Sequence, residues 1–278
     1  MLPPLPRIPL CLAVLRIVAA LAAFTAMPAF ADMGPCKPHG ERDILLCGEG
    51  DGAAIVIADT TSPSKALALA WRSPDASPLE QPDDDALELL ILRLKDGAVL
   101  GKSTTQYWNT GELRANHPSE TAWWSPDSRF LVRSFSMRYG SDTLELYEIG
   151  GGSASRPFDL LKLLDAPLRK SLKPRLAGQS RSKNRNKDVE DFIFILAGRD
   201  DRTPPVQIDA RGNIRMNILF WAPKAGPFFY YTVQLTLARG KDGPTARIGS
   251  IAYRGMSNGD GAAETTRGGR RKRVEAAE

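Results

Sequence analysis

The sequence predicts an all-β protein, an antiparallel β-rich domain with at most one short helix. Short runs of apolar and β-branched residues recur along the chain, and clusters of Gly, Pro, Asp and Ser separate them. Apolar spacing typical of an amphipathic helix occurs in a single segment. A turn motif that follows a Trp occurs twice. The roughly 247 residues after position 31 are enough for one large domain or two small ones.

Residues 1–31 are predicted to be a secretory signal peptide. Arg7 precedes a long apolar run, and no acidic residue lies within that run. The run closes on Ala29-Phe30-Ala31, the small-x-small pattern that signal peptidase requires because only small side chains fit its specificity pockets. We therefore expect cleavage after Ala31 and a mature chain that is periplasmic or secreted.

The alternative for this segment is an uncleaved membrane anchor. Arg16 interrupts the apolar run, and a charged side chain is costly at mid-membrane depth. Pro28 favours an extended backbone just before the expected cleavage point. Lipidation of Cys36 is disfavoured because Pro35 precedes it. No later stretch is apolar enough to cross a bilayer, so we expect no stable membrane span once the signal is removed.

The charge balance argues against one large class of partner. The chain carries 37 Lys and Arg against 32 Asp and Glu, and loss of Arg7 and Arg16 with the signal leaves a net charge of about +3. So small an excess does not indicate nucleic-acid binding, which also has no place outside the cytoplasm. We expect no nucleic-acid partner.

Cys36 and Cys47 are the cysteines of the mature chain, an even number in an oxidising compartment. We expect a disulfide between them, which would close a short loop and stabilise the N-terminal edge by about 2–3 kcal/mol. The alternative is a metal site made by both thiolates and His39. That set lacks a fourth ligand, and oxidation of the thiols would compete with metal binding, so we expect no metal.

Turn residues divide most of the remaining chain into strands. Residues 60–64 and 95–97 connect apolar runs tightly enough to predict hairpins. The predicted strands are 53–59, 65–72, 87–94, 98–102, 130–137, 143–149, 192–196, 206–209, 214–221, 228–238 and 246–253.

Three segments depart from this strand pattern. Residues 158–172 carry leucines at helical spacing, with Asp159 near the start and basic residues near the end, which predicts the single helix. Residues 169–187 are crowded with Lys and Arg and are expected to be a solvated, mobile loop. The alternative there is a patch for an anionic partner such as phospholipid headgroups or polyanionic glycan. Residues 256–278 lack apolar surface and are expected to be a disordered tail.

Two segments about 52 residues apart share a Trp followed by Ser-Pro-Asp, a spacing in the range of propeller blades. The indole fills space between packed sheets, Pro presets the first turn position, and Asp bonds to the turn backbone. The residues expected to build these turns are Trp71, Pro74 and Asp75 in the first copy and Trp124, Pro126 and Asp127 in the second.

This pattern resembles the WD40-like, TolB-type β-propeller repeat, in which Trp-Ser-Pro-Asp-Gly-Lys precedes an apolar strand, a turn and a strand ending in Tyr. Residues 122–149 match it well; residues 69–102 match less well, because Arg72 adds a residue and 76–85 is an insertion. The resemblance covers roughly a quarter of the chain and implies a propeller-like domain, complete or incomplete, over residues 32–255. It leaves open whether the C-terminal strands are further blades or a separate sheet, and Ser-Pro-Asp turns also occur in other β proteins.

No catalytic motif stands out in the chain. It contains no Gly-x-Ser-x-Gly nucleophile elbow, no phosphate-binding glycine loop and no paired-histidine metal motif. Asp83-Asp84-Asp85 lacks the ligand spacing of a Ca²⁺ loop and is expected to be a solvated turn. We therefore predict no catalytic residue and no cofactor.

Residues 106–118 are the most site-like stretch, since they gather aromatic, amide and basic side chains in the connection between the two repeat copies. Such loops commonly hold binding residues, and Tyr, Trp and Arg are favoured contact residues. The alternative is that the aromatic side chains simply pack beneath the loop. The predicted binding residues are Tyr107, Trp108, Asn109, Arg114 and His117.

Together these features predict an exported, non-enzymatic binding or scaffold module whose partner is an envelope protein or glycan. The alternative is a periplasmic hydrolase or lyase that acts on glycan or small esters through residues that the sequence does not single out. The absence of a catalytic motif favours the binding module.

Overall fold

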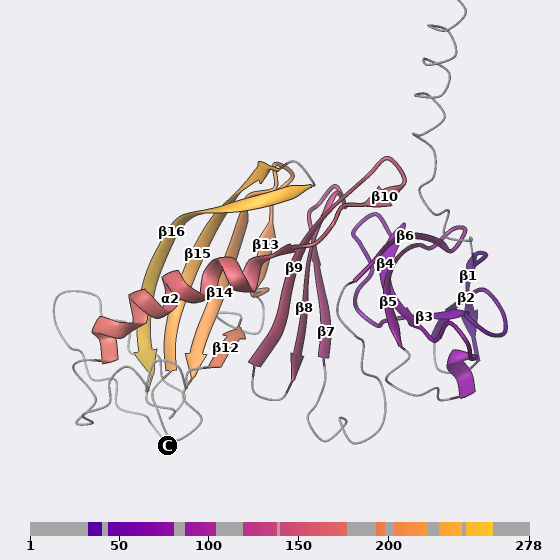
Figure 1. Cartoon of the computed structure of the whole chain (residues 1–278), viewed down its shortest axis with the longest axis horizontal. Coiled ribbons are helices and arrows are strands. Elements are labelled where there is room, and N and C mark those ends of the chain that lie inside the picture. The colour runs from indigo at the N-terminus through magenta and orange to yellow at the C-terminus, as the bar shows by residue number, and fades with distance from the viewer. Residues whose placement is uncertain are drawn as a thin grey trace, which may run out of the picture. The chain divides into compact units, whose positions relative to one another are not determined.

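A computed structural model describes most of the chain after residue 32 (Figure 1). All of the described residues lie in one compact unit, Asp32–Glu278, and no helix among them is long and apolar enough to cross a membrane. The predicted signal peptide, residues 1–31, lies outside the described residues. The structure describes residues 33–40, 44–80, 87–103, 119–137, 140–176, 193–197, 203–221, 228–240 and 243–257.

These residues form three antiparallel sheets and one α-helix, which confirms the predicted all-β class (Figure 1). Sheet 1 contains, in spatial order, β1 (Cys36–His39), β2 (Ile44–Cys47), β3 (Ala54–Val56), β4 (Leu67–Arg72), β5 (Glu88–Arg93) and β6 (Ala98–Lys102), with the short 3-10 helix η2 (Pro78–Glu80) between β4 and β5 in the chain. Sheet 2 contains β7 (Ser119–Trp124), β8 (Phe130–Met137), β9 (Gly140–Gly150) and β10 (Ser153–Ala154), with β11 (Phe158–Asp159) also beside β9. Helix α2 (Leu160–Leu176) precedes sheet 3, which contains β12 (Ile193–Leu196), β13 (Val206–Ile208), β14 (Ile214–Trp221), β15 (Phe228–Arg239) and β16 (Pro244–Ser257).

Side-chain burial explains why apolar residues alternate with polar ones in sheet 3 but form continuous runs in sheet 1. Along β14, the residues from Ile214 to Phe220 alternate between buried and more exposed positions, because one face of the strand packs into the core. Nearly every residue of β4 and β5 is buried instead. Both faces of sheet 1 are covered at these strands, so the sequence there is a continuous apolar run.

Sheet 2 packs against both of its neighbours. Leu131 and Tyr147 join a core with Leu69 of sheet 1. Val132 points the other way and packs in a larger core with Tyr231 of sheet 3 and with α2. Since successive residues of a strand face opposite sides of its sheet, adjacent residues of β8 belong to different cores.

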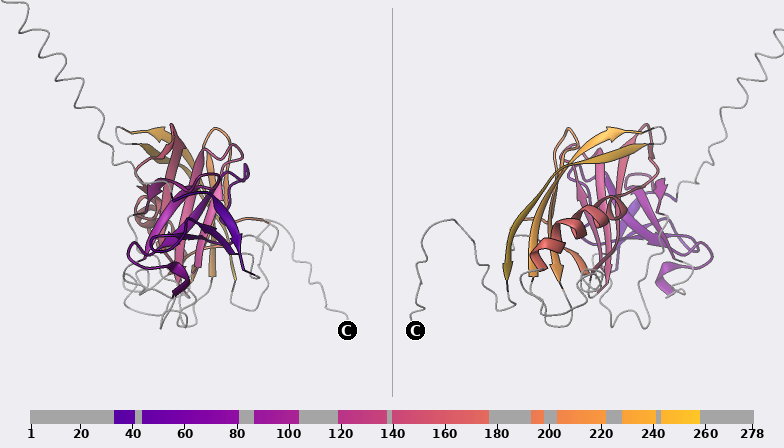
Figure 2. Two further views of the ribbon diagram at one scale, coloured as in Figure 1. Left: turned by 90° about the vertical axis from the view of Figure 1, so that its right-hand side faces the viewer. Right: turned by 60° about the vertical axis from the view of Figure 1, so that its left-hand side comes forward.

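Helix α2 lies across one face of sheet 3 (Figures 1 and 2). Four leucines spaced four residues apart form its fully buried stripe in the larger core. The Asp159 carboxylate accepts the Lys162 N–H at 2.8 Å, which caps the start of the helix. The stripe consists of Leu160, Leu164, Leu168 and Leu172.

The helix begins later and ends later than predicted, because β11 occupies residues 158–159 and the helix continues to residue 176. The first part of the predicted basic loop, residues 169–176, is therefore helical. One of its cations, Arg175, lies over the ring of Tyr253, 4.5 Å from the centroid. Residues 177–187 lie outside the described residues.

Other strands were missed by the sequence-based expectation or have different bounds; for example, β3 is shorter than the predicted 53–59 and β9 is longer than the predicted 143–149. The hairpin of β1 and β2 was not predicted, because the sequence around Cys36 is rich in turn residues. Strand β7 was not predicted, because the repeat motif overlaps its end. β16 continues to Ser257, so residues 256–257 belong to a strand that pairs with β15 and not to the tail. The remainder of the predicted tail lies outside the described residues.

Two turns with the same hydrogen bonds join adjacent strands in sheets 1 and 2. In the turn after β3, the Ser62 N–H donates to Leu67 O (2.8 Å), and Ser62 Oγ accepts the Leu67 N–H (3.2 Å). In the turn after β7, Ser125 makes the same two bonds with Phe130, each 2.9 Å long. In each turn the serine Oγ accepts a backbone N–H at the point where the chain reverses. The two turns therefore have the same hydrogen-bond pattern.

This geometry corrects the predicted alignment of the two repeat copies. The sequence aligns residues 73–75, after Trp71, with residues 125–127. Residues 73–75 instead follow the end of β4 and begin the long connection to β5. The counterpart of 125–127 is the segment 62–64, since both join adjacent antiparallel strands directly. Pro74 and Asp75 therefore do not occupy the turn that Pro126 and Asp127 occupy.

Sheet 3 contains a related turn without the sequence signature. The Asp209 N–H donates to Asn213 O (3.0 Å), and Asp209 Oδ1 accepts the Asn213 N–H (2.8 Å). Asp replaces Ser as the side-chain acceptor, and Gly212 adopts a positive φ of 84°. Each sheet thus holds a run of four consecutive antiparallel strands, β3–β6, β7–β10 or β13–β16. Four-stranded sheets are the units of β-propellers; membership of the WD40-like family stays a prediction.

Candidate binding groove

The predicted disulfide is present. Cys36 and Cys47 face each other across β1 and β2, with their Cα atoms 3.9 Å apart and their sulfurs bonded. Cys47 is fully buried in a small core on one face of sheet 1. The bond consumes both thiolates, so they do not form the alternative metal site with His39.

The predicted binding residues lie outside the described residues. They belong to 104–118, of which the structure describes only the flanking positions, Ser103 at the end of β6 and Ser119 at the start of β7. Their role therefore stays a prediction. The residues concerned are Tyr107, Trp108, Asn109, Arg114 and His117.

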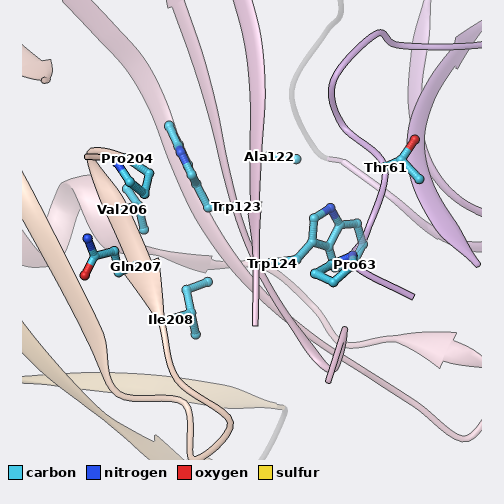
Figure 3. Close-up of a pocket in the computed structure, with 9 residues that line it drawn as sticks. All are labelled: Thr61, Pro63, Ala122, Trp123, Trp124, Pro204, Val206, Gln207 and Ile208. Carbon is cyan, nitrogen blue, oxygen red and sulfur yellow. The ribbon is translucent and has the colours of Figure 1, made fainter. Parts of the chain in front are cut away.

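A groove of about 370 Å³ lies where all three sheets meet (Figure 3). Edge strand β7 of sheet 2 runs along it, the turn after β3 of sheet 1 lies on one side, and β13 of sheet 3 lies on the other. Its volume is at the lower end of the range for ligand pockets. The lining residues are Thr61, Pro63, Ala122, Trp123, Trp124, Pro204, Val206, Gln207 and Ile208.

The two adjacent indoles of β7 point to opposite sides of the groove. Trp123 points toward Pro204 and Val206 of sheet 3, and Trp124 points toward Pro63 of sheet 1 (Figure 3). This divergence follows from the alternation of side chains along a strand. Both indoles are half-buried, so each contributes to a core and still presents surface to the groove.

The groove has an exposed rim and a buried wall. Thr61, Pro63 and Gln207 are exposed at the rim. On the wall, Val206 and Ile208 are only 2% and 7% exposed. The rim is therefore where substitutions change groove access without opening the core.

Trp124 is held by a specific hydrogen bond. Its indole Nε1–H donates to Thr60 O at 2.8 Å, from sheet 2 to sheet 1. The adjacent turns are also joined, since the Ser64 N–H donates to Ser128 Oγ at 3.2 Å. These bonds fix the side of the groove formed by sheets 1 and 2. Trp124, predicted as a structural residue of a repeat turn, thus both joins two sheets and lines the groove.

A buried charge cluster lies on the face of sheet 2 that meets sheet 1. The Arg133 guanidinium donates to both carboxylate oxygens of Glu120, at 2.5 and 2.9 Å. It also donates to Glu145 Oε2 at 2.8 Å and to Ser103 Oγ at 2.7 Å. The Tyr147 hydroxyl donates to the same Glu145 oxygen at 2.6 Å. Such pairing is needed because an unpaired buried charge costs several kcal/mol.

The charges of these five residues do not balance. One guanidinium faces two carboxylates that are almost completely hidden from water. Burial raises the pKa of Glu120 to about 7; the bonds from Arg133 oppose this rise, and the charge of Glu145 adds to it. Burial and Glu145 also raise the pKa of the Tyr147 hydroxyl. Near neutral pH, Glu120 is therefore close to the point at which it takes up a proton.

The charge cluster fixes the start of β7. Ser103 follows the last residue of β6, and Glu120 is the second residue of β7. Arg133 bonds to both of them. The cluster therefore holds together the two flanks of the segment 104–118 and sets the path of β7 toward the groove. We assign it a positioning role for β7.

The chain matches no known protein-family model and no curated protein. Among the residues that the structure describes, no group of three or more His, Cys, Asp or Glu side chains is arranged to hold a metal ion. The function is therefore argued from the groove and the elements around it.

Sequence reasoning missed most of the groove. Thr61 and Gln207 are separated by more than half of the chain, and no local pattern links them. Two signals were available. The pair Trp123-Trp124 in a short strand must present one indole on each face, and Arg133 interrupts an apolar strand whose neighbours are buried.

Proposed function

We propose that the chain is an exported, non-enzymatic binding module whose partner occupies the groove between the three sheets. The observation that carries this proposal is the pair of indoles on edge strand β7, which face residues of the other two sheets across one open groove. Half-buried Trp side chains are favoured contact residues in binding sites, since they offer large rigid surfaces.

Two features support an extracytoplasmic location. The N-terminal 31 residues have the charge and small-residue pattern of a secretory signal. The disulfide between Cys36 and Cys47 suits an oxidising compartment. We infer that the mature chain works in the periplasm or outside the cell.

The proposed architecture is a propeller-like array of three four-stranded blades. The similar hydrogen-bond patterns of the turns at Ser62, Ser125 and Asp209 support it, because each turn joins the first two strands of a four-strand run. In such an array the first strands of neighbouring blades come together. β7 and β13, which line the groove, are the first strands of the second and third runs.

The chemistry of the groove favours binding over catalysis. Apart from backbone groups, its polar lining consists of the Thr61 hydroxyl, the Gln207 amide and the Trp indoles. This lining offers no pair of groups for general acid–base or nucleophilic chemistry. No observation on the described residues favours the hydrolase or lyase alternative.

A capture experiment with a groove variant tests this function. The full chain, exported with its own leader and purified from the periplasm, is immobilised and exposed to envelope extract from the source organism. We expect Gln207→Arg to reduce capture of specific partners at least tenfold, because a long charged side chain at the exposed rim blocks the groove. The measurement is quantitative mass spectrometry against a mock bait.

Gln234→Arg is the matched control. Gln234 is also an exposed strand glutamine, but it lies on β15, away from the groove lining. Capture that survives in both variants, or that never exceeds the mock bait, would overturn the proposal. Loss in both variants would also count against it, since the effect would then come from added charge alone.

A further inference from the structure

Two strands that lie at sheet edges among the described residues bound the groove. β7 pairs only with β8, and β13 pairs only with β14, within the part of the chain that the structure describes. An edge strand presents backbone N–H and C=O groups that another chain can bind. The groove therefore offers main-chain hydrogen bonds as well as apolar side chains.

Hydrogen bonds next to β7 show which of its backbone groups face outward. The Ser125 N–H donates to Phe130 O. In an antiparallel pair every second residue is bonded to its partner strand, so Trp123 also bonds to β8. The N–H and C=O of Ala122 and Trp124 then point away from β8. They have no hydrogen-bond partner among the described residues.

The same reasoning applies to β13 but leads to a closed edge. The Asn217 N–H donates to Pro205 O at 2.8 Å, so the outward backbone groups belong to Val206 and Ile208. Both residues are buried, whereas Ala122 and Trp124 are half-buried. The accessible edge is therefore that of β7.

Spacing decides how a ligand strand would fit. Some Cα atoms of β7 and β13 lie within 8 Å of each other, whereas two strands on either side of an inserted strand are about 9.6 Å apart. A strand therefore does not fit between β7 and β13 where they lie this close. A ligand strand pairs with the outward backbone groups of β7 alone, and its side chains reach the walls of the groove.

The walls select for apolar side chains. A strand paired with β7 alternates its side chains between the two sides of the groove, as β7 itself does. One set then meets Trp123 and Pro204, and the other meets Trp124 and Pro63 (Figure 3). The cavity of about 370 Å³ suits a short stretch of extended chain and not a folded surface.

We propose that the outward backbone groups of β7 bind a short, extended, apolar polypeptide segment of a partner protein as an additional strand. This proposal rests on the proposed binding function and specifies its ligand. Main-chain hydrogen bonds to Ala122 and Trp124 provide the affinity, and the Trp and Pro side chains of the groove select the sequence.

The test uses a phage-displayed library of random linear peptides as the probe. The strongest binder is synthesised with a fluorescent label, and its affinity is measured by fluorescence anisotropy. A second version of the peptide carries N-methyl groups at alternate backbone positions, in both registers. We expect enriched sequences with alternating apolar residues, and an affinity at least tenfold weaker when the N-methyl groups are in the register that faces β7.

Ala122→Pro provides the complementary variant of the protein. It removes the outward N–H of Ala122, which makes no bond to β8, and edge strands tolerate Pro at such positions. We expect a tenfold or greater loss of peptide affinity. Ala122→Val is the matched control, since it adds similar bulk and keeps the N–H; it should bind within about threefold of the wild type.

The outcomes separate this proposal from the proposed function. If Gln207→Arg abolishes capture while Ala122→Pro and N-methylation change nothing, the groove binds but strand addition is wrong. A library that yields no groove-dependent peptide also overturns strand addition. Capture from envelope extract that survives protease treatment of the extract but not periodate treatment identifies a glycan ligand, which overturns the proposal as well.

Discussion

Arg133 and Arg129, which lie close together in the chain, show how burial changes the contribution of an ion pair to stability. Arg129 pairs with Glu148 at the surface, and its side chain is 43% exposed; such pairs contribute about 0–1 kcal/mol. Arg133 is fully buried and pairs with Glu120 and Glu145. Loss of Arg133 leaves two buried carboxylates without their counter-charge, at a cost of about 3–5 kcal/mol. The positioning role that we assign to the charge cluster depends on this difference.

Glu120 is expected to invert the usual pH dependence of a carboxylate. Its pKa is raised from 4.5 to about 7 in the folded chain, so between these values the folded state binds more protons than the unfolded state. Stability from this residue is then fully present below pH 4.5 and falls as the pH rises toward 7. The shift corresponds to about 3 kcal/mol. Urea unfolding at pH 5 and pH 8 measures it.

Glu120→Gln is the comparison that isolates this effect. Gln has the shape of the protonated carboxyl and does not titrate, so the variant should lack the loss between pH 5 and pH 8. The other groups of the cluster, Arg133, Glu145 and Tyr147, are unchanged in both proteins. If the free energy of unfolding changes with pH in the same way in the wild type and the variant, Glu120 has an ordinary pKa and the prediction is wrong.

At the scale of elements, β7 carries most of the candidate site. Glu120 near its start belongs to the charge cluster, and Trp123 and Trp124 at its end line the groove. Six consecutive residues thus contact all three sheets. Strand alternation makes this possible, because Glu120 and Trp124 share one face and Trp123 occupies the other.

The β1–β2 hairpin depends on its disulfide. It is short, lies at the edge of sheet 1, and contains exposed residues at three of the four positions of β1. We expect the double variant Cys36→Ser/Cys47→Ser to lower the free energy of unfolding by about 2–3 kcal/mol. Urea unfolding with and without reductant is the measurement. Reductant should lower the free energy of unfolding of the wild type to that of the variant and leave the variant unchanged. If reductant does not change the stability of the wild type, the prediction is wrong.

At the scale of the whole molecule, the three sheets follow one another along the chain and pack against one another through shared cores. Sheet 2 holds the other two together, since each of its faces contributes to a separate core. The groove exists only because of this assembly. No sheet, counted with its adjoining turns, contributes more than four of the nine lining residues.

Export is a property of the whole chain that processing can test. When the full chain is expressed in a Gram-negative host, we expect it in the periplasmic fraction with Asp32 as its first residue, measured by intact-mass spectrometry. Ala31→Leu should block cleavage, because the signal peptidase pocket accepts only small side chains. Phe30→Leu, at the intervening position, should be processed normally. Cytoplasmic recovery of the uncut wild type would refute the export prediction.

Local physics explains which parts of the fold could be predicted. β8 and β14 were predicted with their observed bounds, because continuous or alternating apolar residues end at clear turn residues. The disulfide was predicted because only two cysteines remain after the signal. The helix was predicted to end at Leu172 but continues to Leu176; its last turn was missed because Lys173, Pro174 and Arg175 carry no apolar helical pattern.

The candidate site divides in the same way. The sequence by itself determined the all-β class, most strands and the pairing of Cys36 with Cys47, because these depend on neighbours along the chain. The tertiary structure decided the groove, the buried partners of Arg133, and the equivalence of the turns at Ser62 and Ser125. Each of these depends on side chains from different sheets or on hydrogen-bond geometry, and residue order alone does not encode which surfaces meet.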